Sequence, residues 1–361
     1  MKNGIFVIDA DGHLLEPAAE LKLEKPFETQ GPTQVTDPHT GKPKLLFAGR
    51  LWTKDGRGQQ NPGIAPTPGQ AGVERPTDAA ARIADMDREG IDVAYLFPTS
   101  VTSMIRHAEG PLSTALCRAY NNWVADWVKP YADRLKPVGA MPFPAPDEAV
   151  MELRRCVEKL GMRAVWVPTN VYGRNLDSPL YYPFYAEAER LGAVVMCHAN
   201  AGGYETGAEC GSERFENFFC THMVSMPFEM MLTAVALITG GVCDQFPRLH
   251  FALLETGAGW VPYWFERMEE HYHKIAYLVP GMRRKPDEYL EQLFISCDPG
   301  EETLPHVLEV AEDSIIFASD YPHWDGEYPR AVAKIADRRT LTDTQKRKVL
   351  GENAKRMFHV N

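Results

Sequence analysis

Short runs of almost wholly apolar residues alternate along the chain with longer segments that carry apolar residues at helical spacing. The runs Ala193–His198 and Leu293–Asp298, for example, read AVVMCH and LFISCD. Runs that are apolar along their whole length are typical of strands buried on both faces of a parallel sheet. The pattern predicts eight such strands: Ile5–Asp9, Val93–Pro98, Lys136–Pro142, Ala164–Pro168, Ala193–His198, Leu249–Glu255, Leu293–Asp298 and Ser314–Asp320.

The segments between these runs predict helices. Asp147–Leu160 carries apolar residues three or four positions apart and is followed by Gly161, a candidate C-cap. The same reasoning predicts helices over Thr77–Glu89, Leu112–Val128, Pro227–Thr239, Gly259–His273 and Thr342–Phe358. Strands and helices in strict alternation favour a single (β/α)8 barrel domain spanning residues 1–361. The alternative, a doubly wound open sheet, is disfavoured because no GxGxxG turn follows any predicted strand.

Two segments interrupt the alternation. Residues 31–76 contain 15 Gly and Pro around one short apolar run, LLFAGRLW. We interpret them as an insertion after the first strand that carries a small hairpin, and not as a second domain. Residues 199–220 form a long, Gly-rich loop after the fifth strand. Such a loop at the carboxyl end of a barrel strand is either a substrate-binding lid or a disordered surface insertion, and the sequence leaves both open.

Composition limits the classes of partner. The formal net charge is -11 and Lys and Arg form no block, which argues against nucleic acid or an anionic membrane as the main partner. The chain contains no uncharged apolar run long enough for a membrane span, so none is predicted. The start MKNGIFVIDADGH does not resemble a secretory signal. Seven cysteines without a CxxC pair fit reduced thiols in the cytoplasm. We therefore expect a cytoplasmic protein that acts on a small molecule, with a homodimer as the expected oligomer.

The ends of four predicted strands carry carboxylates or imidazoles. Asp11 and His13 end the first, His198 the fifth, Glu255 the sixth and Asp320 the eighth. Taken singly, such an Asp can be a helix N-cap or a turn residue, and such a His can be a hydrogen-bonded structural residue. Because the carboxyl ends of barrel strands meet at one face, the set together predicts a site for a divalent Zn, Mn or Fe ion. One ion is expected, or two if Asp11 and Glu255 bridge.

Further residues near these strand ends are candidates for catalysis or substrate contact. His222 and His323 could supply imidazoles to the site, although each could equally be a polar residue that holds a loop in place. The aromatic rings of Tyr321 and Trp324 could wall an apolar substrate pocket or simply pack at the rim. Two further polar candidates for substrate contact are Glu16 and Asn200.

Five motifs in the chain also resemble a known family. They are IDADGHLLEP, VVMCHA, GGVCDQFPRLHFALLETGAGWVPYWFERM, FASDYPHWD and LTDTQKRKVLGENAKRMF. They are similar to the amidohydrolase-related family, the branch of the amidohydrolase superfamily with 2-amino-3-carboxymuconate-6-semialdehyde decarboxylase and the hydroxybenzoate decarboxylases. The resemblance covers the chain apart from residues 31–76. It implies a (β/α)8 barrel of the metal-dependent hydrolase type, with His13, His198 and Asp320 as ligands. Asp11 stands where other members have the first residue of His-x-His or Glu-x-His.

One departure from the family pattern affects the expected reaction. The decarboxylase members carry a His at the end of the sixth strand, where this chain has Glu255. An ionised carboxylate is better suited to accept a proton or to bind metal than to protonate a carbon atom.

The leading hypothesis is therefore a metal-dependent hydrolase of an ester, lactone, amide, thioester or C–C bond. Metal-activated water would attack, Asp320 or Glu255 would act as base, and His222 or His323 would stabilise the oxyanion. The alternative is a nonoxidative, metal-dependent decarboxylase of a hydroxylated aromatic or unsaturated acid, with His222 or His323 as proton donor. A ligand-binding barrel without catalysis is disfavoured, because it would not need four converging ligands.

Overall fold

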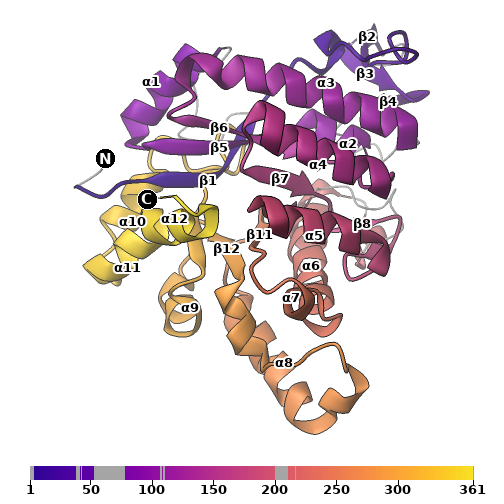
Figure 1. The fold of residues 1–361 in the computed structure, drawn as a ribbon. Coiled ribbons are helices and arrows are strands. Elements are labelled where there is room, and N and C mark those ends of the chain that lie inside the picture. The colour runs from indigo at the N-terminus through magenta and orange to yellow at the C-terminus, as the bar shows by residue number, and fades with distance from the viewer. Residues whose placement is uncertain are drawn as a thin grey trace.

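The computed structural model describes residues 4–37, 41, 43–52, 78–105, 108, 110–199, 210–215 and 217–360. Eight parallel strands form one sheet that curves into a barrel, with helices outside it (Figure 1). All eight predicted strands are present and the (β/α)8 architecture is confirmed. In spatial order the strands are β1 (Ile8–Leu14), β5 (Val93–Pro98), β6 (Leu135–Ala140), β7 (Ala164–Val167), β10 (Val194–His198), β11 (Phe251–Leu254), β12 (Leu293–Cys297) and β13 (Ile315–Phe317).

The first strand differs from its predicted bounds in a way that matters for the site. It runs over Ile8–Leu14 and not Ile5–Asp9, so Asp11 and His13 belong to the strand itself. Its pairing with β5 is irregular between Asp9 and Gly12. All seven residues of β1 are buried although three of them are ionisable. Burying ionisable side chains is costly unless other groups compensate for their lost hydration.

The barrel closes between β1 and β13, the two ends of the hydrogen-bonded strand order. Closure is made at the carboxyl ends by two backbone hydrogen bonds. The Asp320 amide donates to the Asp11 carbonyl at 2.9 Å, and the His13 amide donates to the Tyr321 carbonyl at 2.8 Å. This β1/β13 seam therefore lies directly under two of the predicted ligand positions.

The predicted helices are present, with changes at their ends. Gly161 ends α4 in the left-handed conformation, as its sequence position predicts. The last predicted helix begins with a capping box between Thr342 and Gln345, but a π-helical turn at Lys348–Glu352 divides it. The helices are α1 (Ala79–Glu89), α2 (Ser100–Ile105), α3 (Gly110–Val128), α4 (Pro146–Leu160), α5 (Tyr182–Leu191), α6 (Phe218–Thr239), α7 (Val242–Gln245), α8 (Val261–Ile275), α9 (Leu304–Ala311), α10 (Ala331–Ala336), α11 (Asp343–Arg347) and α12 (Asn353–Phe358).

Helix α6 corrects two expectations from the sequence. It begins at Phe218 and continues through Pro227, where the sequence predicts its first turn, so His222 lies on a helix and not on the loop before it. By length and composition alone, Phe219–Thr239 is also apolar enough to cross a membrane. That test is weak, because 56% of its most apolar window is buried inside the structure, as in the core helices of many folded proteins.

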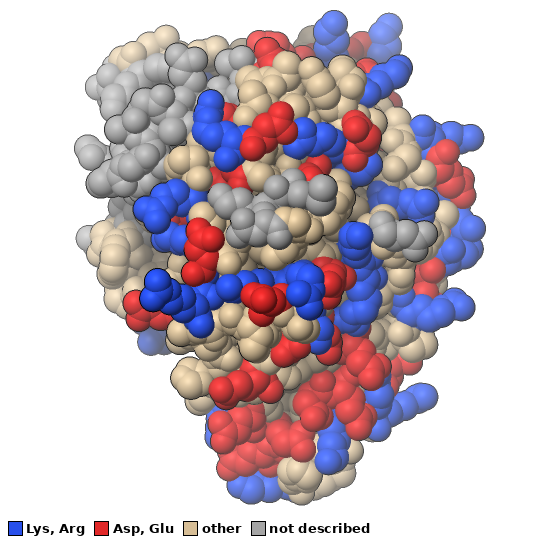
Figure 2. Space-filling view, turned by 90° about the vertical axis from the view of Figure 1, so that its left-hand side faces the viewer, with Lys and Arg blue, Asp and Glu red and all other residues tan. Residues whose placement is uncertain are grey.

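The first predicted insertion carries the expected hairpin. Strands β3 (Pro43–Phe47) and β4 (Arg50–Trp52) pair antiparallel over the run LLFAGRLW, and β2 (Thr33–Thr36) pairs with β3. Most of the long loop after β10, residues 200–209, lies outside the described residues. On the face shown in Figure 2, basic and acidic side chains are mixed over the upper part, and acidic ones gather toward the lower end.

Candidate metal centre

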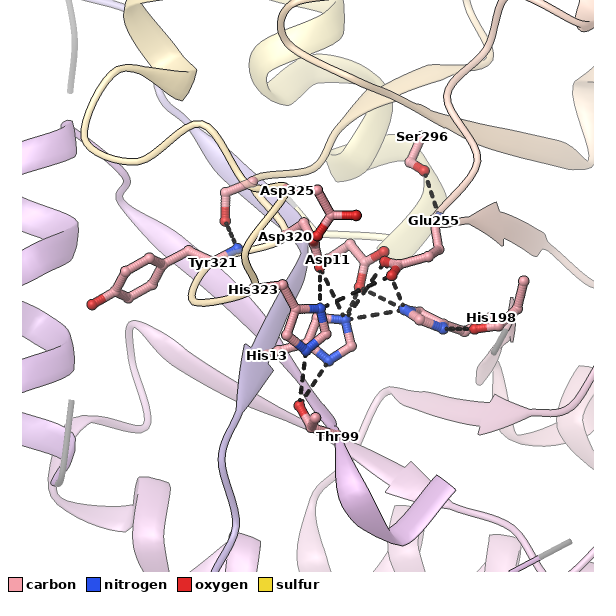
Figure 3. Close-up of polar contacts among 12 residues, drawn as sticks. Asp11, His13, Thr99, His198, Glu255, Ser296, Asp320, Tyr321, His323 and Asp325 are labelled. Carbon is pink, nitrogen blue, oxygen red and sulfur yellow. Dashed lines mark hydrogen bonds and ion pairs between the residues drawn. The ribbon is translucent and has the colours of Figure 1, made fainter. Parts of the chain in front are cut away.

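Five side chains from β1, β10 and the ends of β11 and β13 point at one another at the carboxyl end of the barrel (Figure 3). We call Asp11, His13, His198, Glu255 and Asp320 the donor cluster. The two Nε2 atoms of its imidazoles are 3.0 Å apart. His13 Nε2 lies 3.4 Å from Asp11 Oδ1 and 3.5 Å from Asp320 Oδ1, and His198 Nε2 lies 3.2 Å from Glu255 Oε2. The sequence-predicted ligands are thus brought together.

The spacing and chemistry of the donor cluster fit a divalent ion. Ligands about 2.1 Å from one metal ion lie roughly 3.0–3.5 Å from each other, which matches the distances above. Asp11 Oδ1, Glu255 Oε2 and Asp320 Oδ1 are buried and lie 3.4, 3.2 and 2.7 Å from the nearest nitrogens of His13, His198 and His323. Crowding three carboxylates in a buried site is costly unless positive charge balances them. A divalent cation among them would supply that charge.

Contacts outside the cluster orient both imidazoles. His198 Nδ1 lies 2.6 Å from the Ala199 carbonyl, an acceptor, so Nδ1 carries a proton and Nε2 is the nitrogen that faces the cluster and would bind a metal once deprotonated. His13 Nδ1 is 3.4 Å from Thr99 Oγ1. Both Glu255 and Asp320 have positive φ, 70° and 52°, a conformation that is uncommon for residues other than glycine. Backbone of this kind often occurs at functional sites.

The carboxylates of the site are crowded together and shift the pKa values of one another and of His198. Burial, together with Glu255, raises the pKa of Asp11 well above 3.8, and burial with Glu255 and Asp325 does the same for Asp320. Burial disfavours a charged His198, but Asp11 and Glu255 outweigh it and raise its pKa to about 9. Glu255 is buried too, yet the imidazoles around it hold its pKa at about 2. A bound divalent cation would favour the ionised carboxylates and so lower the pKa values of Asp11 and Asp320.

Of the two other imidazoles, His323 lies against the cluster. Its ring stacks on His13 with centroids 3.9 Å apart, and its Nδ1 is 2.7 Å from Asp320 Oδ1. Its Nε2 is 3.1 Å from Thr99 Oγ1, which therefore contacts both rings. The His323 side chain keeps 16% of its surface exposed, whereas His13 keeps 2%. His323 thus lies between the cluster and the solvent.

His222 and Trp324 lie further out on the same side. The two rings meet edge to face with centroids 5.7 Å apart, and His222 Nε2 lies 3.8 Å from Asp325 Oδ2. His222 also contributes to lowering the pKa of Glu255, so it belongs to the electrostatic surroundings of the cluster. This places one indole and one imidazole at the outer edge of the site.

Two of the predicted substrate contacts have partners within the protein. The Glu16 carboxylate is buried and accepts hydrogen bonds from the backbone amides of Thr99, Ser100 and Val101, at 3.0, 2.6 and 2.6 Å. It caps the start of α2. Tyr321 points away from the cluster (Figure 3), because its hydroxyl donates to Asp85 on α1 at 2.6 Å. The remaining candidate, Asn200, lies outside the described residues.

Sequence reasoning missed Thr99 and Arg82. Thr99 directly follows β5, so the rule that located the other strand-end residues could have found it. Arg82 is 1% exposed and donates to the His13 and Tyr321 carbonyls, at 3.1 and 3.0 Å. The signal for Arg82 is weaker, because an arginine in an amphipathic helix is normally exposed.

Comparison with known proteins agrees with this arrangement. The family model described as amidohydrolase matches residues 8–360. This chain belongs to the amidohydrolase family. Among curated members, it is 28% identical to 2-amino-3-carboxymuconate-6-semialdehyde decarboxylase of Dictyostelium discoideum, over 77% of this chain and 75% of that protein.

Solved structures share the fold of this amidohydrolase. An amidohydrolase from Mycobacterium avium subsp. paratuberculosis K-10 superimposes with a TM-score of 0.80 at 23% identity, covering 98% of this chain and 99% of the other. A dihydroxybenzoic acid decarboxylase from Polaromonas sp. JS666, solved with bound manganese and the inhibitor 2-nitroresorcinol, gives a TM-score of 0.64 at 20% identity. That match covers 78% of this chain and 86% of the other. At these identities the likeness establishes the barrel fold.

Proposed function

We propose that this amidohydrolase is a metal-dependent, nonoxidative decarboxylase of a small hydroxylated aromatic or unsaturated carboxylic acid. Two observations support the proposal over hydrolysis. The curated relative named above is a decarboxylase that aligns with three quarters of the chain. In addition, the imidazole of His323 stacks against the donor cluster, so a proton donor is present although the sixth strand ends in Glu255. The position of His323 is the observation that carries the proposal.

In this proposal Asp11, His13, His198, Glu255 and Asp320 hold the divalent ion. When bound, such an ion supplies the positive charge that binds an anionic substrate and polarises its oxygens. The protein's part is to fix the five donors, to bury them, and to keep the outer side accessible through His323, His222 and Trp324. An aromatic or unsaturated acid fits this outer side because an indole and two imidazole rings line it.

Decarboxylation needs a proton at the carbon that loses CO2. The carbon–carboxylate bond breaks, CO2 departs, and the electron pair left on carbon takes up a proton. We assign His323 as the residue that delivers it. The Nδ1 of His323 lies 2.7 Å from Asp320 Oδ1, which holds the ring against the cluster, and its partial exposure lets solvent restore the proton that it gives up. His222, facing Asp325, is the second imidazole available for this role.

Hydrolysis remains a second candidate because of Glu255. The low pKa of this carboxylate keeps it ionised, so it can accept a proton from water but cannot donate one near neutral pH. A hydrolase would use it as the base. The two reactions thus assign different residues to proton transfer, His323 for decarboxylation and Glu255 for hydrolysis.

The test is a pair of assays on protein loaded with Mn²⁺ or Zn²⁺. A panel of hydroxybenzoates and unsaturated dicarboxylic acids is screened for released CO2, and esters, lactones and thioesters are screened in H2¹⁸O for label in the product. We expect CO2 release, its loss in His323→Asn, and retention of metal by that variant. Turnover with ¹⁸O entering the product, and no CO2 from any acid, would contradict the proposal and favour the hydrolase.

A further inference from the structure

Helix α1 carries a buried polar stripe that the proposed reaction does not use. Arg82, Asp85 and Glu89 lie on one side of the helix, three and four positions apart, and face the chain that follows β13. Arg82 and Glu89 are 1% and 3% exposed. Burying charges on a helix is costly unless each has a specific partner, so the contacts of this stripe need an explanation.

Arg82 bridges the two sides of the β1/β13 seam. One nitrogen, Nη1, donates both to the His13 carbonyl on β1 at 3.1 Å and to the Tyr321 carbonyl beyond β13 at 3.0 Å. The guanidinium also lies 4.8 Å from the centre of the Tyr321 ring. The other nitrogen, Nη2, approaches Asp9 Oδ2 at 3.8 Å. A Cβ at position 12 would lie 2.4 Å from Nη2, so Gly12 makes room for the guanidinium.

Asp9 extends the same connection across the seam. Its Oδ1 accepts the Ser319 amide at 2.9 Å, and its Oδ2 accepts the Ser319 hydroxyl at 2.6 Å. Asp9 is completely buried and Ser319 is 2% exposed. The residues joined in this way are immediate neighbours of proposed ligands, because Asp9 lies two positions before Asp11 and Ser319 directly precedes Asp320.

Asp85 and Glu89 hold the remainder of the same chain segment. The two oxygens of Asp85 accept the hydroxyls of Tyr321 and Tyr328, at 2.6 and 2.8 Å, and Glu89 accepts the Val332 amide at 2.7 Å. The stripe thus fixes the segment 319–332 at three points from the outside of the barrel, and this segment carries Asp320 and His323.

We propose that Arg82 is a positioning residue that sets the separation of His13 and Asp320 across the β1/β13 seam. This inference rests on the proposed metal site and extends it to a residue that touches neither metal nor substrate. Elsewhere in the barrel a parallel ladder fixes neighbouring strands, whereas here two backbone hydrogen bonds, the Asp9–Ser319 pair and Arg82 do so. Without the guanidinium, the seam loses the side chain that binds the His13 and Tyr321 carbonyls together, and the 3.5 Å distance between His13 Nε2 and Asp320 Oδ1 is held less firmly.

The test compares Arg82→Lys with Arg134→Lys. Arg134 is a control because its guanidinium also donates to two backbone carbonyls, those of Ile91 and Asp92. These carbonyls directly precede β5, at the end of the barrel opposite to the donor cluster. At both positions two different guanidinium nitrogens contact the protein, Nη1 and Nη2 of Arg82 and Nε and Nη2 of Arg134, and the single ammonium of a lysine cannot replace both. Co²⁺ and Mn²⁺ affinities are measured by competition with a chelator, and the visible absorption of bound Co²⁺ reports its ligand geometry.

We expect Arg82→Lys to weaken metal binding about 10- to 100-fold and to alter the Co²⁺ spectrum, as loss of a residue that orients ligands does. Arg134→Lys should leave both unchanged even if its melting temperature falls as much. Equal metal affinity and identical spectra in the two variants would overturn the inference while leaving the metal site intact. A wild-type protein that binds neither ion would overturn the proposed metal site and the inference with it.

A second variant covers the case in which Arg82→Lys does not fold. Tyr321→Phe removes only the hydrogen bond to Asp85 and keeps the ring beneath Arg82. We expect metal affinity to fall about three- to tenfold, in line with one buried hydrogen bond. Metal affinity and a Co²⁺ spectrum identical to the wild type in this variant would contradict the inference.

Discussion

The two ends of the barrel use the same kinds of side chain in opposite ways. At the amino-terminal end, His250 Nδ1 contacts the Met357 carbonyl at 2.9 Å, and Asn353 donates to the Ile315 and Glu312 carbonyls, at 2.7 and 2.9 Å. At the carboxyl end, the imidazoles of His13 and His198 face the crowded carboxylates of Asp11, Glu255 and Asp320. The polar groups at one end bind the protein's own backbone, whereas those at the other form the proposed metal site.

This difference separates stability from function within one architecture. Polar groups whose hydrogen bonds are all made within the protein hold the barrel together. Buried carboxylates with raised pKa values store unfavourable energy, which binding of a divalent ion would release. Variants at the carboxyl end should therefore lose metal affinity, and variants at the amino-terminal end should lose folding free energy.

The largest difference is expected between His198→Ala and His250→Ala. His198 supplies an Nε2 atom to the donor cluster, so its loss should weaken metal binding by more than about 100-fold and abolish turnover. His250 contacts only the opposite end, so its variant should bind metal like the wild type and lose stability instead. Inductively coupled plasma mass spectrometry after dialysis measures the metal in both. Equal metal content would contradict the contrast.

Glu255→Gln tests whether the strand-six carboxylate belongs to the metal or to proton transfer. Because Glu255 Oε2 lies 3.2 Å from His198 Nε2, we expect at least about tenfold weaker metal binding. The control is Glu152→Gln, which changes a fully buried carboxylate that Arg155 already pairs at 2.6 Å, away from the donor cluster. Retained metal affinity with lost turnover at saturating metal would instead identify Glu255 as a base, and would favour hydrolysis.

Glu16→Gln tests whether this carboxylate near the end of β1 caps α2 or binds substrate. The variant loses the charge that accepts three backbone amides at the start of α2, so the free energy of unfolding should fall by about 1–3 kcal/mol. KM and metal affinity should stay within twofold of the wild type. Urea titration measures the first quantity, with Glu20→Gln as an exposed control. A large rise in KM without loss of stability would restore the substrate-binding role.

The smallest expected effect is a pH dependence at the amino-terminal end. Burial lowers the pKa of His250 below its ordinary 6.5, and His359 and Arg356 beside it add to the shift against the Met357 hydrogen bond. A neutral His250 therefore stabilises the fold fully above pH 6.5, and this contribution is lost as the pH falls through the folded-state pKa. His250→Gln should flatten the loss of unfolding free energy between pH 7 and 5. His306→Gln, which changes an exposed histidine on α9, should not. If the unfolding free energies of the wild type and His250→Gln fall equally with pH, His250 is not the source of this pH dependence.

The strand-end residues could be predicted from sequence because the barrel brings the carboxyl ends of its strands together. Apolar runs locate those ends, so Asp11, His13, His198, Glu255 and Asp320 follow from pattern alone. The close-up in Figure 3 shows these five side chains converging, together with His323.

The remaining roles depend on partners that sequence does not place. Glu16 caps a helix that begins more than 80 residues later, at Ser100. Tyr321 turns outward because Asp85 of α1 accepts its hydroxyl. The sequence places His222 before a helix because a proline usually marks a helix start, yet α6 continues through Pro227. Each case turns on packing between elements far apart along the chain.

The central claim is that the donor cluster holds a divalent ion. The most direct measurement is anomalous diffraction from crystals of the wild-type protein grown with Mn²⁺. We predict an anomalous peak within about 2.0–2.4 Å of His13 Nε2, His198 Nε2 and at least two of the three carboxylates. Fully occupied Mn²⁺ elsewhere, with Asp11, Glu255 and Asp320 bonded only to protein or water, would contradict the account.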